Sequence, residues 1–124
     1  MGVEDNRAVV RGTYESFERG DLEALFAALD DDIVWVNHTP SSTFYGEHKG
    51  IDGMRAMVTK IGEDLEITHF QLQTLVADGD HVVALVEQGF TDKSTGQAHR
   101  GPLIHFCEVH DGRITRVDEF EGDL

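Results

Sequence analysis

Residues 101–122 read GPLIHFCEVHDGRITRVDEFEG, and this stretch decides how we interpret the rest of the chain. Two runs rich in β-branched and aromatic residues flank the tripeptide His110-Asp111-Gly112. Gly112 can adopt the left-handed conformation that a three-residue hairpin loop with a bulge requires. We therefore predict a C-terminal β-hairpin whose loop is closed by Val109 and Arg113.

The length of that loop determines which side chains share a face. With a three-residue loop His105 lies opposite Val117 and diagonal to Glu119, roughly 5–8 Å away across the strands. An imidazole and a carboxylate would then share an otherwise apolar wall. With a two-residue turn the faces change, and His105 would lie opposite Asp118 instead. The side chains predicted to share the face are those of Leu103, His105, Cys107, Val109, Thr115, Val117 and Glu119.

The length and charge of the chain limit what it can be. Its 124 residues suit a single domain, residues 1–124, that buries roughly two-thirds of the surface of the unfolded chain. Ten basic residues against 24 acidic ones give a formal net charge of −14. Such a charge repels phosphate backbones and anionic membrane surfaces, so we expect neither nucleic acid nor membrane as a partner.

Three further features concern location, cysteine and metal. No apolar run approaches the roughly 20 residues of a membrane span, and the opening MGVEDNRAVV lacks the pattern of a signal peptide, so we expect a cytoplasmic protein. The single cysteine, Cys107, cannot form an internal disulfide and is expected to be a small buried side chain. The seven histidines follow no familiar ligand spacing, and we expect no bound metal.

The rest of the sequence predicts helices followed by strands. Apolar residues recur at three-, four- and seven-residue spacings, which is typical of amphipathic helices. We place helices over residues 3–18, 22–29 and 51–64. Runs of β-branched and aromatic residues bounded by turn residues indicate strands. We place strands, ahead of the hairpin, at residues 33–36, 67–77 and 81–91.

Between these elements we expect a solvated acidic corner at residues 30–32 and a loop at residues 41–50. The order of elements predicts one α+β unit, a meander of long antiparallel strands with covering helices. Long strands of this kind commonly curl, and the concave face then encloses a pocket.

Several side chains are candidates for the wall of that pocket. Trp35 and Asn37 alternate on their strand and share a face, which places a ring for stacking beside an amide that donates and accepts. The alternatives are core packing for Trp35 and a turn-forming role for Asn37. Tyr14 and Phe17 face inward from the first helix, where core packing is the alternative. On the hairpin, the residues expected to contact a ligand are Leu103, Cys107 and Val117.

Glu119 is the strongest candidate for chemistry. Glutamate is rarely buried without a partner, so its place on an apolar face favours acid/base work or substrate contact. The alternatives are a structural pairing with His105 and plain exposure to solvent. An apolar pocket can raise the pKa of a carboxyl group until it serves as an acid or base near neutrality, and we expect this of Glu119. Imidazole changes charge between about pH 5 and 8 as a class, which suits a proton partner.

Two motifs and the order of elements resemble a known family. Residues 17–35 read FERGDLEALFAALDDDIVW, and the pattern H-x6-G-[RK]-I-x4-[DE] runs from His105 to Glu119. Over nearly the whole chain this resembles the SnoaL-like branch of the nuclear-transport-factor and ketosteroid-isomerase superfamily. The resemblance implies a cone-shaped, cystatin-like α+β roll, in which a curved antiparallel sheet and three helices from the N-terminal half enclose a pocket.

The resemblance also implies site residues and an assembly. The polyketide cyclases of this branch carry an acid/base aspartate on the last strand and a site histidine on the preceding one, which correspond to Glu119 and His105. The ketosteroid isomerases match less well, because their general-base aspartate corresponds to Asn37. A homodimer is implied through the outer face of the sheet. The apolar residues exposed there in a monomer would be Ile104, Phe106 and Phe120.

Our preferred hypothesis is a cofactor-free acid/base enzyme of the cyclase, isomerase or dehydratase type. It would act on a small, mostly apolar molecule, cyclic or polyketide-like, with Glu119 moving a proton that His105 holds or shares. The most useful single observation is a structure that shows whether both side chains face a cavity of about 300 Å³ or more. The first alternative is a noncatalytic domain that binds a small molecule or dimerises. The second is an epoxide hydrolase of the limonene-epoxide-hydrolase type, which needs an inward-facing arginine between two carboxylates.

Overall fold

The computed structural model describes residues 2–122. Its first two helices are separated by the dipeptide Gly20-Asp21. Helix α1 (Val3–Arg19) ends at Gly20, which takes the left-handed conformation with φ 73° and donates its backbone N–H to the carbonyl of Phe17. Asp21 then caps α2 (Leu22–Ala27) by accepting a hydrogen bond from the Ala24 N–H at 3.1 Å. The chain thereby turns sharply between the two helices.

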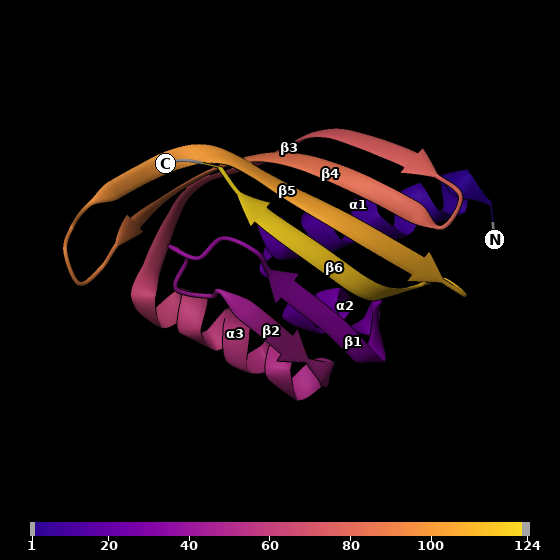
Figure 1. Ribbon diagram of the computed structural model, residues 1–124, viewed down its shortest axis with the longest axis horizontal. Coiled ribbons are helices and arrows are strands. Elements are labelled where there is room, and N and C mark those ends of the chain that lie inside the picture. The colour runs from indigo at the N-terminus through magenta and orange to yellow at the C-terminus, as the bar shows by residue number, and fades with distance from the viewer. Residues whose placement is uncertain (1, 123–124) are drawn as a thin grey trace.

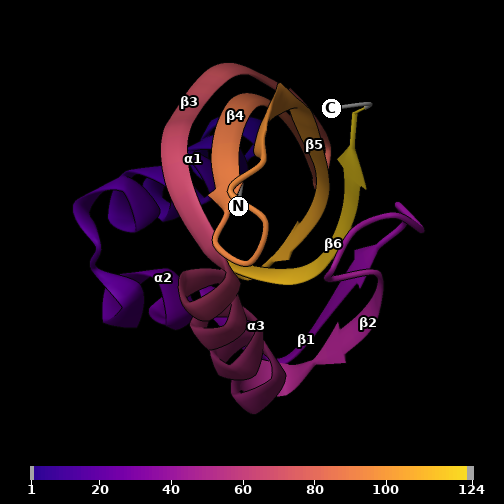
Figure 2. The ribbon, with the colours of Figure 1, turned by 90° about the vertical axis from the view of Figure 1, so that its left-hand side faces the viewer.

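The six strands among residues 2–122 form one sheet in the order β2-β1-β6-β5-β4-β3 (Figure 1). Neighbouring strands are antiparallel except for β1 and β6, which run parallel. The strands are β1 (Leu29–Asn37), β2 (Gly46–Lys49), β3 (Leu65–Asp78), β4 (His81–Asp92), β5 (Ala98–His110) and β6 (Arg113–Glu121). Helix α3 (Gly50–Asp64) joins β2 to β3, and an end-on view shows how strongly the sheet curls (Figure 2). The predicted α+β roll with three helices is confirmed.

Two local predictions between the helices are wrong. The loop predicted at residues 41–50 contains β2, whose backbone pairs with β1 from Val34↔Lys49 to Asn37↔Gly46. The corner predicted at residues 30–32 is instead part of β1. Asp31 and Asp32 are exposed there, so their carboxylates stay hydrated while the backbone extends into the sheet. A run of three acidic residues is therefore compatible with a strand when their side chains can reach water.

The core fills the space between the concave face of the sheet and the helices. Helix α1 contributes Val10 and Tyr14, and α3 contributes Met54 and Met57, all of which are buried. The sheet supplies the larger share, from four different strands. Its buried apolar side chains include Leu29, Ile33, Val82, Ala84, Val86, Leu103, Cys107, Val109, Ile114 and Val117.

The C-terminal hairpin forms, but the predicted three-residue loop is wrong. His110 pairs with Arg113, so the turn has two residues, Asp111 and Gly112, with φ of 51° and 78°. Positive φ at both positions is what the favoured two-residue hairpin turn needs. The pairing then shifts between Glu108 and Val109 of β5, because β6 carries one extra residue there.

The bulge returns the β6 side chains beyond it to the faces that we predicted from a three-residue loop. Val109 pairs with Ile114 and Glu108 with Arg116, which leaves Thr115 as the extra residue. Beyond the bulge His105 lies directly opposite Glu119, neither opposite Val117 nor opposite Asp118. The two-residue turn and the bulge each move the pairing by one residue. Together they move it by two, which leaves the β6 side chains beyond the bulge on their predicted faces.

Thr115 itself was predicted on the wrong face. Ile114, which is 2% exposed, occupies the inward position next to the bulge, and Thr115 is only half-buried.

Within residues 2–122 no helix combines the length and the apolar character that crossing a bilayer requires.

Candidate active site

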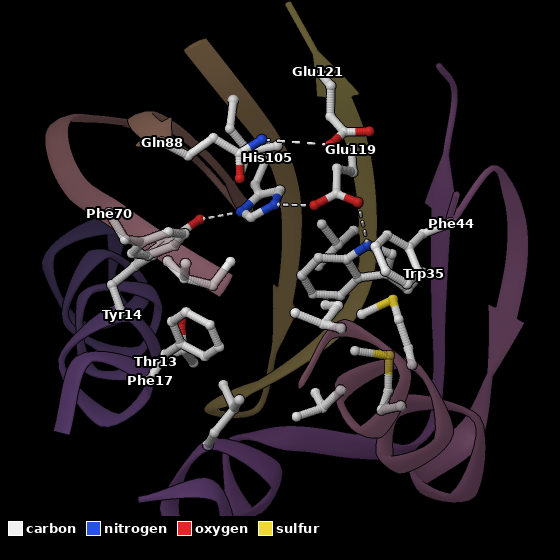
Figure 3. A pocket seen from close by; sticks show the side chains of 18 of the residues that line it. Thr13, Tyr14, Phe17, Trp35, Phe44, Phe70, Gln88, His105, Glu119 and Glu121 are labelled. Atoms are coloured by element: carbon white, nitrogen blue, oxygen red, sulfur yellow. Dashed lines mark hydrogen bonds and ion pairs between the residues drawn. The ribbon is translucent and has the colours of Figure 1, made fainter. Parts of the chain in front are cut away.

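A cavity of about 120 Å³ lies under the concave face of the sheet, with α1, α2 and α3 contributing to its walls (Figure 3). The cavity therefore does not reach the size of about 300 Å³ that we looked for, which is the lower end of the roughly 300–1,000 Å³ of most ligand pockets, and it is close to the ~150 Å³ of a cavity that can hold benzene. It therefore fits a single ring without rearrangement. The predicted site residues on its wall are Tyr14, Phe17, Trp35, Leu103, His105, Cys107, Val117 and Glu119. Asn37, 1% exposed, is not on the wall and lies behind Glu119.

His105 and Glu119 form a direct pair on this wall. Nε2 of His105 lies 2.7 Å from Oε2 of Glu119, and the two side chains are 7% and 13% exposed. The pair follows from the register of β5 and β6, which sets the two residues opposite each other on the concave face. Directly opposed side chains in an antiparallel pair come close enough for such a bond.

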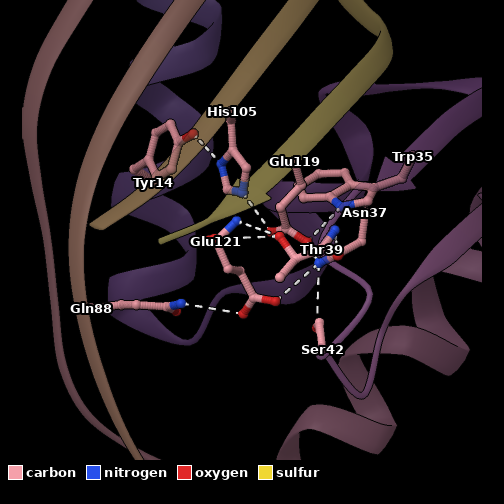
Figure 4. Close-up of polar contacts among 9 residues, drawn as sticks. All are labelled: Tyr14, Trp35, Asn37, Thr39, Ser42, Gln88, His105, Glu119 and Glu121. Atoms are coloured by element: carbon pink, nitrogen blue, oxygen red, sulfur yellow. Dashed lines mark hydrogen bonds and ion pairs between the residues drawn. The ribbon is translucent and has the colours of Figure 1, made fainter. Parts of the chain in front are cut away.

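The second carboxylate oxygen of Glu119 is held from the neighbouring strand β1 (Figure 4). Oε1 accepts a hydrogen bond from the Asn37 amide at 2.8 Å and another from the Trp35 indole N–H at 3.2 Å. Trp35 and Asn37 alternate on β1 and reach the same carboxylate because the parallel register sets Asn37 beside Glu119. Three donors from two strands therefore fix the carboxylate.

The other ring nitrogen of His105 meets the first helix. Nδ1 lies 2.5 Å from the hydroxyl oxygen of Tyr14, and the two rings stack with centroids 5.8 Å apart. If Nε2 donates to Glu119, a neutral imidazole has Nδ1 as its acceptor, and the Tyr14 hydroxyl then donates to it. The result is a continuous chain of hydrogen bonds from Tyr14 through His105 to Glu119.

The protonation of these groups differs from the expectation for Glu119. Burial raises the pKa of the Glu119 carboxyl, but the hydrogen bond and charge of His105, together with the donors Asn37 and Trp35, outweigh burial and hold the pKa below its usual range. The predicted upward shift is therefore wrong. Burial raises the pKa of the Tyr14 hydroxyl well above its ordinary value, with the charges of Cys107 and Glu119 adding to the effect. Tyr14 is thus a neutral donor near neutrality.

Cys107 lies on the same wall as a thiol. Burial, with a smaller effect from the charge of Asp118, raises the pKa of Cys107 to about 12. Because the thiolate is the nucleophilic form of cysteine, the side chain contributes packing rather than reactivity.

Sequence reasoning missed a second acidic residue on the wall. The carboxylate of Glu121 accepts hydrogen bonds from the Asn37 amide at 3.2 Å and from the Gln88 amide at 3.4 Å. Glu121 follows Glu119 by two positions, so the alternation of side chains along β6 was a sufficient signal for it. Gln88, Phe44 and Phe70 also line the cavity, and nothing local in the sequence marks them.

The arginines of the chain lie away from this cavity. Within residues 2–122 no arginine lines it: Arg55 pairs with Glu23, Arg100 with Glu87, and Arg116 with Asp118. The inward-facing arginine that the epoxide-hydrolase alternative needs is therefore missing from the cavity wall that the described residues form. Across the same residues no three side chains of His, Cys, Asp or Glu gather as a metal site would require.

Comparison with known families gives one broad match. A family model described as SnoaL-like domain matches residues 4–117, which is nearly the whole chain. No curated protein matches the sequence significantly.

Solved structures share the fold at low sequence identity. An NTF2-like protein from Burkholderia xenovorans superposes with a TM-score of 0.88 at 24% identity, over 98% of this chain and 92% of that one. TerC, co-crystallised with polyporic acid, gives 0.83 at 19% identity over 95% and 92%. A proposed polyketide cyclase from Xanthomonas campestris gives 0.77 at 22% identity over 97% and 92%. At these identities the matches establish the fold alone.

Proposed function

This chain belongs to the SnoaL-like domain family, and we propose that it is an enzyme that moves a proton on a small, mostly apolar molecule held in its cavity. The reaction is of the cyclase, isomerase or dehydratase type. One observation carries the proposal: the hydrogen bond of 2.7 Å between His105 and Glu119, both nearly buried on the wall of an otherwise largely apolar cavity. Paired ionisable groups in such a place are typical of functional sites.

The geometry divides the work between the two side chains. A carboxylate held by three donors, with its pKa lowered, is better suited to stabilise positive charge on His105 than to release a proton itself. We therefore assign proton transfer to His105 and its orientation to Glu119. A base that is positioned by a third group is a recurring arrangement in acid/base catalysis.

Tyr14 controls access to His105. Its hydroxyl occupies Nδ1 of His105, while Glu119 occupies Nε2. A substrate atom that exchanges a proton with the imidazole has to share or displace the Tyr14 hydroxyl. The displaced hydroxyl remains a neutral donor that can bind a substrate oxygen beside the imidazole.

A noncatalytic binding domain is the competing function. It is favoured by the complete set of protein donors around Glu119, since nothing in that set needs a substrate to be satisfied. The small cavity of about 120 Å³ is equally suited to holding a ring-sized ligand without changing it.

Conversion of small molecules distinguishes the two functions. The purified protein is incubated with the small-molecule fraction of a cell extract, and the compounds consumed and formed are followed by mass spectrometry. We expect the wild type to convert at least one compound and His105→Gln and Glu119→Gln to convert none, with both variants folded by circular dichroism. Asp118→Asn, one position along the same strand but on the outer face, is the matched control and should convert as the wild type does. A compound that co-purifies unchanged with all four proteins would instead establish a binding domain.

We also propose a homodimer joined through the outer face of the sheet. Ile104, Phe106 and Phe120 are 38%, 40% and 44% exposed on that face, and Ile104 lies directly opposite Phe120. Neighbouring exposed apolar side chains of this kind mark interaction surfaces. Phe106→Glu should give a monomer in light scattering coupled to size exclusion. Leu22→Glu, which changes an exposed apolar residue on α2, should leave the dimer intact. A wild-type monomer at micromolar concentration would contradict the proposal.

A further inference from the structure

We propose that the cavity takes a ring-sized apolar molecule that carries a protonated amine, and that Glu121 is the residue that selects it. The inference rests on the proposed use of the cavity as a ligand site and adds the chemical class of the ligand. Glu121 lies on the cavity wall at the end of β6, next to the Asn37 amide and Gln88 (Figure 4).

The two carboxylates on the wall are held very differently. Glu119 accepts from three donors at 2.7–3.2 Å, one of which is an imidazole that can carry positive charge. Glu121 accepts from two neutral amides, at 3.2 Å and 3.4 Å. One of these amides, Asn37, already donates to Glu119 at 2.8 Å through the same nitrogen. A carboxylate has about four acceptor positions, so Glu121 retains the capacity to accept strong, charged donors.

The charge of the wall favours a cation over an anion. Among residues 2–122 no lysine or arginine lines the cavity, so His105 is the basic side chain there, and its Nε2 is already paired with Glu119. A ligand carboxylate would meet two fixed carboxylates in a place with little water to screen them. The formal net charge of −14 adds a field around the whole protein that attracts cations and repels anions.

The apolar part of the wall suits the same ligand. Aromatic rings line the cavity from several elements, including Tyr14 and Phe17 on α1, Trp35 on β1 and Phe70 on β3. Such rings bind the body of a small cyclic molecule and also attract a cation through their faces. An ammonium group bound at Glu121 would thus have its apolar ring among aromatic side chains.

Three probes of similar size test the selection: benzylamine, benzyl alcohol and benzoate, titrated calorimetrically into the wild type at low salt. We expect benzylamine to bind about tenfold more tightly than benzyl alcohol, because a charged hydrogen bond to a partly buried carboxylate is worth about that factor. Benzoate should bind more weakly than either. Glu121→Gln keeps the shape of the side chain and should remove the advantage of benzylamine while leaving benzyl alcohol nearly unchanged.

Glu108→Gln, on the neighbouring strand β5 and away from the cavity wall, is the matched control and should retain the preference. The inference fails if benzoate binds as tightly as benzylamine, if Glu121→Gln leaves the preference intact, or if benzylamine shows no binding at millimolar concentration. These outcomes are separate from the proposed reaction. Acid/base activity is judged by conversion in His105→Gln and Glu119→Gln, so either proposal can fail while the other stands.

Discussion

Two histidine–carboxylate pairs lie on opposite faces of strand β6, and they share one distance. On the concave face His105 and Glu119 are 2.7 Å apart with side chains 7% and 13% exposed, and on the outer face His38 and Asp118 are 2.7 Å apart with side chains 39% and 19% exposed. Glu119 and Asp118 are consecutive residues of a strand, so their side chains point to opposite faces of the sheet, one toward the protein interior and one toward water. The two pairs therefore have the same distance between their atoms and differ in how far water reaches them.

The outer pair has a second, cationic partner that the inner pair lacks. Arg116 donates two hydrogen bonds to Asp118, both at 3.0 Å, and this guanidinium is the main cause of the lowered pKa of the Asp118 carboxyl, with His38 a smaller one. Water can replace either partner there. A buried pair that loses one partner leaves a charge with no solvent, which is far more destabilising.

The largest expected effect comes from removing His105. His105→Ala takes a donor from the buried Glu119 carboxylate, strands the Tyr14 hydroxyl and leaves a hole in the wall. We expect the free energy of unfolding to fall by about 3–5 kcal/mol. Urea denaturation followed by far-ultraviolet circular dichroism, at pH 7 and fixed protein concentration, measures it. A loss below about 1 kcal/mol would mean that the inner pair is no more valuable than a surface pair.

Adjacent residues of β5 offer the same comparison without charge. Leu103 is 4% exposed on the concave face and Ile104 is 38% exposed on the outer face. Leu103→Ala should lower the free energy of unfolding by about 2–4 kcal/mol, since a buried truncation leaves a cavity. Ile104→Ala should lower it by less, and its effect should depend on protein concentration if the outer face is a dimer interface. Equal losses that do not vary with concentration would contradict the assignment of the two faces.

Acidification sharpens the comparison through Glu119. Its pKa is lower in the folded protein than the ordinary value of 4.5, so the folded state binds fewer protons than the unfolded state and is stabilised above that value. This stability is lost as the pH falls through the folded pKa. Glu119→Gln should be less stable than the wild type by about 2 kcal/mol at pH 7, and the gap should narrow below pH 4.5. A gap that does not change with pH would assign the loss to packing.

The smallest expected effect belongs to His38. His38→Ala removes a half-exposed partner from Asp118, which keeps both hydrogen bonds from Arg116. The free energy of unfolding should change by less than about 1 kcal/mol, and by less still in high salt. A loss as large as that of His105→Ala, measured under the same conditions, would remove the distinction between the faces.

Patterns of side chains predicted most of this architecture. The Gly20-Asp21 break, the amphipathic helices and the long strands follow from local patterns of capping residues and apolar side chains. Strand β2 was missed because residues 46–49 read GEHK, which has no apolar alternation, and its pairing depends on the neighbouring β1. The parallel contact between β1 and β6 joins distant segments, and no local pattern indicates it.

The candidate site shows a similar division. The period of two along β6 was enough to bring Glu119 to the face of His105, and it would have found Glu121 had it been followed to the end of the strand. The pKa of Glu119 was predicted in the wrong direction because burial was considered without the donors. Two of those donors, Trp35 and Asn37, lie more than eighty positions away in the sequence and reach the carboxylate through the β1–β6 contact.

The bulge at Thr115 bears on how related chains are aligned. The register of β6 is set twice, once by the hairpin and once by the parallel ladder that places Trp35 beside Val117 and Asn37 beside Glu119. Insertions or deletions at the Asp111-Gly112 tip can therefore be absorbed before the strand reaches the cavity. In this chain the pairing with β1 therefore identifies the position of the carboxylate more directly than counting from the hairpin tip, because a count from the tip has to pass both the turn and the bulge.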